Sequence, residues 1–117
     1  MNVEDLRNYC LSKKHVTEEF PFDDVTLVFK VAGKMFALIG LDHVDLSIAL
    51  KCDPERAQVL RSTHSAIGPA YHMSKTHWNG VRIDGTLKPE FVHELIDHSY
   101  ELVVSKLSGK LKKELDL

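Results

Sequence analysis

The stretch Val25–Ile39, with the sequence VTLVFKVAGKMFALI, is the part of the chain that decides the fold. β-branched and aromatic residues fill both halves of it, and Ala32 and Gly33 lie between them. The pattern predicts strands over residues 25–31 and 34–39, joined by a tight turn into an antiparallel hairpin. A third strand is expected at Leu46–Lys51, where alternating apolar residues predict one face toward a core.

Signals for helices lie on both sides of this β region. A first helix is expected after Asn2, whose side chain can cap it, because apolar residues recur there at helical spacing. Asp53-Pro54 predicts the start of a second helix that ends near Thr63. The longest apolar stripe follows Pro89 and predicts a final helix, which Gly109 is expected to end.

The segments between these elements show weaker patterns. Thr17–Asp24 is acidic and contains a proline, which predicts a loop. Phe20 and Phe22 flank that proline and are expected to pin the loop to the core. Two further short strands are expected at about Tyr71–Met73 and about His77–Ile83.

The expected order of elements is α-β-β-β-α-β-β-α. Because short links join the strands and helices do not alternate with single strands, this order predicts an α+β fold with an antiparallel sheet covered by helices. A chain of 117 residues is expected to form one domain, residues 1–117, around one modest core. The half-charged tail Lys110–Leu117 is expected to be a frayed helix or disordered.

Composition excludes several classes of protein. No apolar run approaches the roughly 18 residues of a membrane-spanning helix, so no membrane association is expected. The N-terminus lacks the basic and apolar segments of a signal peptide, and Cys10 and Cys52 have no metal or redox spacing. We therefore expect a reduced, cytoplasmic protein that is monomeric. The formal charge of −2 means that any nucleic-acid binding must depend on a local patch.

The segment Arg56–Arg82 provides such a patch. It contains no aspartate or glutamate, although the whole chain has 17 of them, and it holds the only tryptophan and three of the seven histidines. The sequence therefore predicts a positively charged surface with aromatic rings on this segment. The residues expected to contact a partner are Arg56, Arg61, Tyr71, His72, Lys75, His77, Trp78, Asn79 and Arg82.

Five motifs occur in order along the chain: FPFDDVTLVFKV (Phe20–Val31), KMFAL (Lys34–Leu38), LKCDPE (Leu50–Glu55), YHMSKTHWN (Tyr71–Asn79) and LIDHSYELV (Leu95–Val103). Together they resemble the MmcQ/YjbR family of small bacterial proteins over nearly the full length. The resemblance implies a fold akin to type III secretion chaperones, α-β(3)-α-β(2)-α. It also implies a DNA-binding protein with a double-wing motif.

Two binding functions are compatible with these residues. In the first, the cations neutralise DNA phosphates, Tyr71 or Trp78 stacks on a base, and the turns near Ala32-Gly33 and Ser74–Thr76 act as wings. In the alternative, a concave face of the sheet binds a protein or a small anion. Both are binding functions that require no catalysis.

Catalysis has little support in the sequence. His72 and His77 are five residues apart, so regular structure places them on opposite faces, and they cannot chelate one metal. Neither cysteine is adjacent to a histidine, and no glycine-rich phosphate loop is present. We therefore expect no enzyme, no catalytic residue, no metal and no cofactor.

Overall fold

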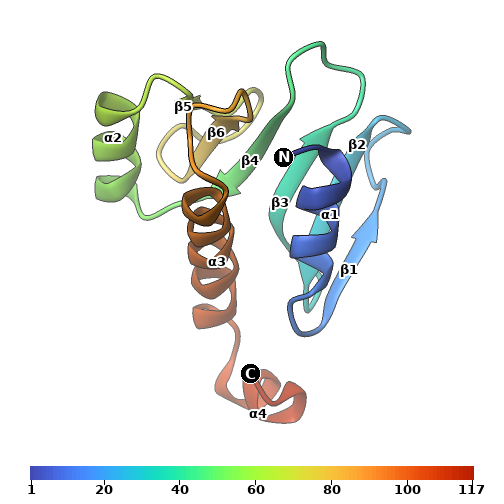
Figure 1. The fold of residues 1–117 in the computed structure, drawn as a ribbon. Coiled ribbons are helices and arrows are strands. Elements are labelled where there is room, and N and C mark those ends of the chain that lie inside the picture. Colours follow the sequence, from blue (N-terminus) through green and yellow to red (C-terminus); the bar gives the residue numbers. More distant parts are fainter.

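The computed structural model describes residues 1–117 and confirms the α+β class (Figure 1). One antiparallel sheet has six strands in the order β1-β2-β3-β4-β6-β5, and four helices complete the fold. None of these helices combines the length and apolar character needed to cross a lipid bilayer. The strands are β1 Val16–Glu19, β2 Thr26–Val31, β3 Lys34–Gly40, β4 Ser47–Lys51, β5 Ile67–Pro69 and β6 Trp78–Arg82. The helices are α1 Val3–Leu11, α2 Pro54–Thr63, α3 Pro89–Ser105 and α4 Gly109–Leu115.

The first two helices begin where the sequence predicts, because their caps are local. In α1 the Asn2 side chain accepts from the Asp5 N–H at 2.8 Å, and the Asp5 carboxylate accepts from the Asn2 N–H at 2.9 Å. Such a reciprocal capping box satisfies two backbone donors of the first helical turn. In α2 the Asp53 carboxylate accepts from the Arg56 N–H at 3.1 Å, and Pro54 occupies the first turn.

The β2–β3 hairpin contains the expected turn and an irregularity that the sequence did not indicate. Ala32 and Gly33 have positive φ values of 51° and 77°, which a two-residue hairpin turn requires. β3 contains a β-bulge at Phe36. Phe29 of β2 pairs with Ala37 and Lys30 pairs with Met35, so Phe36 has no partner on β2. The bulge turns both Phe36 and Ala37 toward the main core.

The two faces of the sheet are covered differently. The main core includes buried side chains of α1, α2 and α3 packed on one face, for example Leu6, Leu60 and Ile96. The opposite face carries a cluster with no helical member, formed by Val28, Leu38, Ala70 and Trp78. A loop that precedes β6, rather than a helix, therefore supplies the cover on that face.

The expected loop over residues 17–24 is wrong in its first part, which forms the edge strand β1. Val16 to Glu19 pair with Val31 to Val28, and an ion pair joins Glu19 to Lys30. A four-residue strand with two glutamates has too little apolar pattern to be recognised locally.

The expectation that Phe20 and Phe22 lie in the core is also wrong. They are 48% and 64% exposed. The chain leaves the sheet after β1 and returns through a turn in which the Asp23 carboxylate accepts from the N–H groups of Val25 and Thr26. These two bonds lower the pKa of Asp23. The phenylalanines therefore lie on a loop whose hydrogen bonds are made by its own aspartate.

The strand expected at Tyr71–Met73 is wrong, because the strand lies earlier, at β5. Gly68 pairs with Gly80, and the chain then crosses over β6. A side chain at Gly80 would place its Cβ 3.3 Å from the Pro69 carbonyl oxygen, so glycine permits this close approach. Residues 71–73 lie in the loop that follows.

The C-terminal region also differs from expectation. The last long helix ends at Ser105 rather than at Gly109, and Gly109 instead begins α4. The Ser108 hydroxyl accepts from the Leu111 N–H at 3.1 Å and so caps this short helix. The element order is therefore α-β-β-β-β-α-β-β-α-α, with one strand and one helix more than the sequence predicted.

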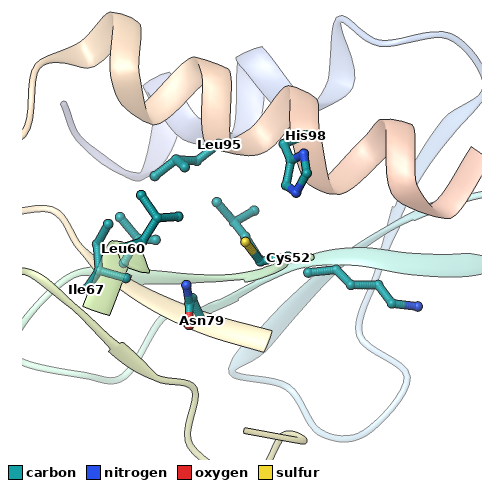
Figure 2. A pocket seen from close by; sticks show the side chains of 9 residues that line it. Cys52, Leu60, Ile67, Asn79, Leu95 and His98 are labelled. Atoms are coloured by element: carbon teal, nitrogen blue, oxygen red, sulfur yellow. The ribbon is translucent and has the colours of Figure 1, made fainter. Parts of the chain in front are cut away.

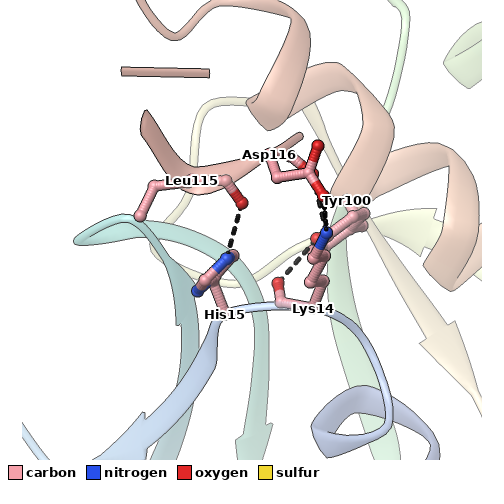
Figure 3. Close-up of polar contacts among 5 residues, drawn as sticks. All are labelled: Lys14, His15, Tyr100, Leu115 and Asp116. Atoms are coloured by element: carbon pink, nitrogen blue, oxygen red, sulfur yellow. Dashed lines mark hydrogen bonds and ion pairs between the residues drawn. The ribbon is translucent and has the colours of Figure 1, made fainter. Parts of the chain in front are cut away.

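The tail forms the short helix α4 and contacts the turn after α1 (Figure 3). Lys14, in the turn after α1, donates to the carbonyl and the carboxylate of Asp116 at 2.8 and 2.9 Å. His15 Nε2 lies 2.7 Å from the carbonyl oxygen of Leu115, and the Tyr100 hydroxyl donates to the Lys14 carbonyl at 2.6 Å. The turn after α1 thereby holds the C-terminal tail, and Lys14 lowers the pKa of Asp116.

Candidate functional site

Two of the predicted cations are held by carboxylates from outside the acid-free segment. Arg56 pairs with Glu94 of α3 at 2.5 Å, and Arg82 pairs with Asp84 at 2.9 Å. Bonds from Thr86 and from Arg82 keep the pKa of Asp84 well below its usual range, so this carboxylate stays charged. Both guanidinium groups are thus partly neutralised before any ligand arrives.

Arg61 is used by the fold itself. Its guanidinium donates to the Asn79 side-chain oxygen at 2.6 Å, to the Trp78 carbonyl at 2.9 Å and to the Lys75 carbonyl. Asn79 is only 2% exposed, and its amide nitrogen lies 3.5 Å from the Ala57 carbonyl. The planar fork of arginine suits such a set of acceptors, so Arg61 anchors the loop before β6 to α2.

The aromatic residues of the segment divide into a buried one and an exposed one. Trp78 is 8% exposed and packs in the small cluster with Val28 and Leu38. Tyr71 is 81% exposed, and its ring lies 3.9 Å from the ring of His72 between centroids. Of the two predicted stacking residues, only Tyr71 offers a free ring face.

The nine predicted residues do not form one surface. Arg61, Lys75, Trp78 and Asn79 lie together at the start of β6. Arg82 lies at the opposite end of that strand. Arg56 lies on the first turn of α2 against α3, while Tyr71, His72, Lys75 and His77 have exposed side chains on the loop before β6.

The structure brings together three other lysines, which sequence reasoning did not place in one site. Lys34, Lys51 and Lys106 line an open cavity of about 270 Å³. None of them is in an ion pair, and no carboxylate lines the cavity. We call this cavity the lysine pocket. Its remaining lining is apolar and consists of Met35, Trp78, Val103 and Leu107.

Strand register explains how these lysines meet. Lys34 begins β3 and Lys51 ends the antiparallel neighbour β4, so the two lie at the same end of the sheet. Lys51 also pairs directly with Trp78 at the start of β6. Lys106 caps the C-terminal end of α3, which lies over β3 and β4. The signals in the sequence were single lysines at the expected strand ends, which apply to Lys34 and Lys51 but not to Lys106.

The other end of the sheet is acidic. The loop from β1 to β2 carries Asp23 and Asp24, and the loop from β3 to β4 carries Asp42 and Asp45. The Leu41 N–H donates to the Val25 carbonyl at 2.7 Å and holds these loops side by side. These loops thus present carboxylates at the end of the sheet opposite the three unpaired lysines of the pocket.

A small cavity between α3 and the sheet brings Cys52 near His98 (Figure 2). Its volume is about 10 Å³, roughly enough for one water molecule. Burial raises the pKa of the Cys52 thiol, and a protonated thiol is a poor nucleophile. Burial, and next the charge of Arg56, lower the pKa of His98, whose Nε2 accepts from the Asp53 N–H at 3.2 Å.

These groups do not form a recognisable catalytic or metal site. Cys10 and Cys52 are both buried free thiols, and burial raises the pKa of Cys10 to about 12. No three histidine, cysteine, aspartate or glutamate side chains are close enough to share a metal ion. The lysine pocket is therefore the group of side chains with the clearest capacity to bind a ligand, and its three unpaired lysines favour an anion.

Comparison with known proteins places the chain among homologues. The family model described as YjbR matches residues 11–102. The chain is 31% identical over 115 residues to the Escherichia coli K12 protein named "Uncharacterized protein YjbR", covering 98% of both chains. It is 32% identical over 112 residues to "Uncharacterized protein YbdF" of E. coli O157:H7, covering 96% of this chain and 92% of that one.

Two solved structures share the fold. The crystal structure of the Deinococcus radiodurans protein DR2400, domain DUF419, superposes with a TM-score of 0.94 at 44% identity. The match covers 99% of this chain and 88% of that chain. A crystal structure from Pseudomonas syringae gives a TM-score of 0.75 at 30% identity, covering 87% and 98% respectively.

Proposed function

The chain belongs to the YjbR family, and from this premise we propose that it is a non-catalytic domain that binds DNA through the lysine-rich end of its sheet. The observation that carries the proposal is that this end holds cations without carboxylate partners. These cations are Lys34, Lys51 and Lys106 around the pocket, with Lys75 on the loop that enters β6.

Free and paired cations differ in what they contribute to binding a phosphate backbone. An arginine already paired with a carboxylate must give up that partner or bring its negative charge to the DNA. A free lysine releases a condensed counterion from the DNA at no such cost. Arg56 and Arg82 therefore contribute little, and the lysines replace them as the expected phosphate contacts.

The separation of charge between the ends of the sheet supports the same orientation. The acidic loops with Asp24 and Asp45 would be repelled by a phosphate backbone, while the lysine end would be attracted. Helix α4, which follows Leu107 of the pocket in sequence, carries exposed Lys110 and Lys113 together with exposed Glu114. A net negative protein can thus approach DNA with one end only.

Tyr71 can add a contact that does not depend on charge. Its ring is 81% exposed on the loop before β6, the loop that also carries Lys75. Stacking of a base on an aromatic ring contributes about 1–3 kcal/mol. The exposed ring favours single-stranded over duplex DNA, whose bases are already stacked.

Fluorescence anisotropy with labelled single-stranded and duplex DNA tests the proposal. If all four lysines contact phosphates, log K is expected to fall with log salt with a slope of roughly −3 for single strands and −4 for duplex. The variant Lys34→Ala/Lys51→Ala/Lys106→Ala should reduce the slope by about 2 to 3. The control is Lys88→Ala, which removes an exposed lysine at the N-terminal end of α3. Absence of binding at 50 mM salt, or the same loss in the control, rejects the proposal.

A second candidate is a protein-binding module, which one further observation favours. Phe20, Phe22 and Val44 are 48%, 64% and 102% exposed at the acidic end of the sheet. Exposed apolar side chains surrounded by carboxylates suit a basic, amphipathic peptide. NMR titration with such a peptide should shift the amide signals of the loops at 20–25 and 41–46, and Phe22→Ser should abolish the shifts. Signals that move only at the lysine end would reject this candidate.

A further inference from the structure

We propose that the lysine pocket receives the terminal phosphomonoester of a nucleic-acid strand. The proposal rests on the DNA-binding function proposed above and specifies the ligand of one part of its surface. It concerns the cavity itself, whose lining combines Lys34, Lys51 and Lys106 with an apolar floor.

The charge of the pocket exceeds what the backbone of a strand requires. A phosphodiester carries a single negative charge, whereas a phosphomonoester carries about −1.5 to −2 at neutral pH and has three strong acceptor oxygens. Three ammonium groups surround the cavity without any carboxylate to share them. Three ammonium groups therefore match the charge and the three acceptor oxygens of a phosphomonoester better than those of a phosphodiester.

The position and size of the pocket suit the end of a nucleic-acid strand. The start of β3, the end of β4 and the C-terminal turn of α3 meet there around an open cavity of about 270 Å³. This volume lies just below the range of roughly 300–1,000 Å³ that is typical of small-molecule sites. A hollow of this size accepts a terminal group, whereas a continuous backbone would pass over its rim.

The end of α3 opposes anion binding, and the lysines outweigh it. The carbonyl groups at the C-terminus of a helix carry roughly half a negative charge. Lys106, which caps this helix, lies at that terminus, and Lys34 and Lys51 face it from the sheet. Three positive charges against about half a negative charge leave the pocket strongly cationic.

The apolar floor distinguishes a nucleotide from a bare anion. Met35, Val103, Leu107 and the edge of the mostly buried Trp78 line the cavity between the ammonium groups. The bulge at Phe36 helps to place Met35 there, because it turns that residue to the face opposite the core. Contact with the terminal sugar and base would bury this surface, which inorganic phosphate cannot do.

Anisotropy with one oligonucleotide sequence in three forms tests the inference. The strand carries an internal label and has a 5′-phosphate, a 3′-phosphate or hydroxyl groups at both ends. We expect one phosphorylated form to bind about tenfold more tightly than the unphosphorylated strand, since charge-assisted bonds are the strong ones. Equal binding of all three forms overturns the inference but leaves DNA binding intact. Absence of binding by every form overturns the proposed function as well.

Two variants and two competitors complete the experiment. Lys51→Met should bring the phosphorylated and unphosphorylated strands to within about twofold, while Lys88→Met should keep the tenfold preference. A preference that survives Lys51→Met overturns the inference. Inorganic phosphate should compete poorly, because it does not use the apolar floor. A deoxynucleoside monophosphate that binds as tightly as the phosphorylated strand would identify free nucleotide as the ligand and overturn the assignment to a strand end.

Discussion

Replacing Arg61 by alanine is expected to destabilise the fold, whereas an exposed phosphate-binding arginine could be removed with little effect on stability. The guanidinium donates to the Asn79 side chain at 2.6 Å and to the carbonyl groups of Trp78 and Lys75. Its removal leaves the 2% exposed Asn79 without the donor for its side-chain oxygen. The loop before β6 also loses its connection to α2.

The magnitude follows from these bonds. A hydrogen bond to a charged group contributes about 1.5–3 kcal/mol, and a buried acceptor left unsatisfied costs a similar amount. The two carbonyl bonds add less, because water can reach the exposed side of Lys75. We expect Arg61→Ala to lower the free energy of unfolding by about 2–4 kcal/mol.

Urea denaturation followed by circular dichroism measures the effect. A loss of about 3 kcal/mol would move the midpoint by roughly 1–2 M for a protein of this size. The matched control is Arg56→Ala on the same helix, which removes an ion pair with Glu94 and should cost only about 0.2–1 kcal/mol. A double-mutant cycle with Asn79→Ala should give a coupling energy above about 1 kcal/mol.

Two results would refute this reasoning. An Arg61→Ala variant within about 0.5 kcal/mol of the wild type would show that the three bonds do not stabilise the fold. An equal loss in Arg56→Ala would show that the effect belongs to any arginine of α2. In either case Arg61 would again be available as a ligand-binding cation.

Three further predictions concern the core and the pH response. Ser99→Ala should lower the free energy of unfolding by about 1–3 kcal/mol in the same denaturation assay. The fully buried Ser99 hydroxyl donates to the Phe36 carbonyl of β3 at 2.5 Å and accepts from the Lys51 N–H of β4 at 2.9 Å. The control Ser105→Ala on the same helix should change the free energy of unfolding by less than about 0.5 kcal/mol. His98 has a lowered pKa in the fold, so the unfolded chain takes up its proton first as pH falls. The contribution of His98 to the free energy of unfolding should therefore be fully present above about pH 6.5 and be lost as the pH falls below it. In the His98→Gln variant, the melting temperature should depend less on pH between pH 7 and 5 than in the wild type. An unchanged dependence of the melting temperature on pH would contradict the assignment to His98. Phe22→Ser should leave the melting temperature in calorimetry nearly unchanged, because this side chain is exposed. Phe36→Ala should lower the free energy of unfolding by about 3–5 kcal/mol, because this side chain is fully buried. Similar losses in the two variants would contradict the exposed position of Phe22.

Features that depend on a few consecutive residues could be predicted from the sequence. The cap of α1, the start of α2 at Asp53 and the turn at Gly33 are each specified within about four residues. The family resemblance followed from five motifs of 5 to 12 residues, and the α+β class followed from the expected order of elements. β1 was missed because its pairing with β2, rather than its own composition, makes it a strand.

The candidate site could be predicted only in part, because the sequence gives the number of charges but not their partners. The acid-free segment contains four arginines and lysines, yet one of them, Arg56, is paired with Glu94, which lies 38 residues further along the chain. Arg61 is used by Asn79 and two carbonyl groups. The same packing buries Trp78 and leaves Tyr71 exposed.

The sequence by itself determined the locally specified features, such as the starts of α1 and α2 and the β2–β3 turn, and it indicated the family to which the chain belongs. Caps, turns and short motifs are specified by neighbouring residues. Only the tertiary structure decided which cations remain free. Strand register and the end of α3 bring Lys34, Lys51 and Lys106 around one cavity, although they are far apart along the chain. Ion pairs form only between groups a few ångströms apart, and residues that are distant in the sequence come that close only in the folded chain.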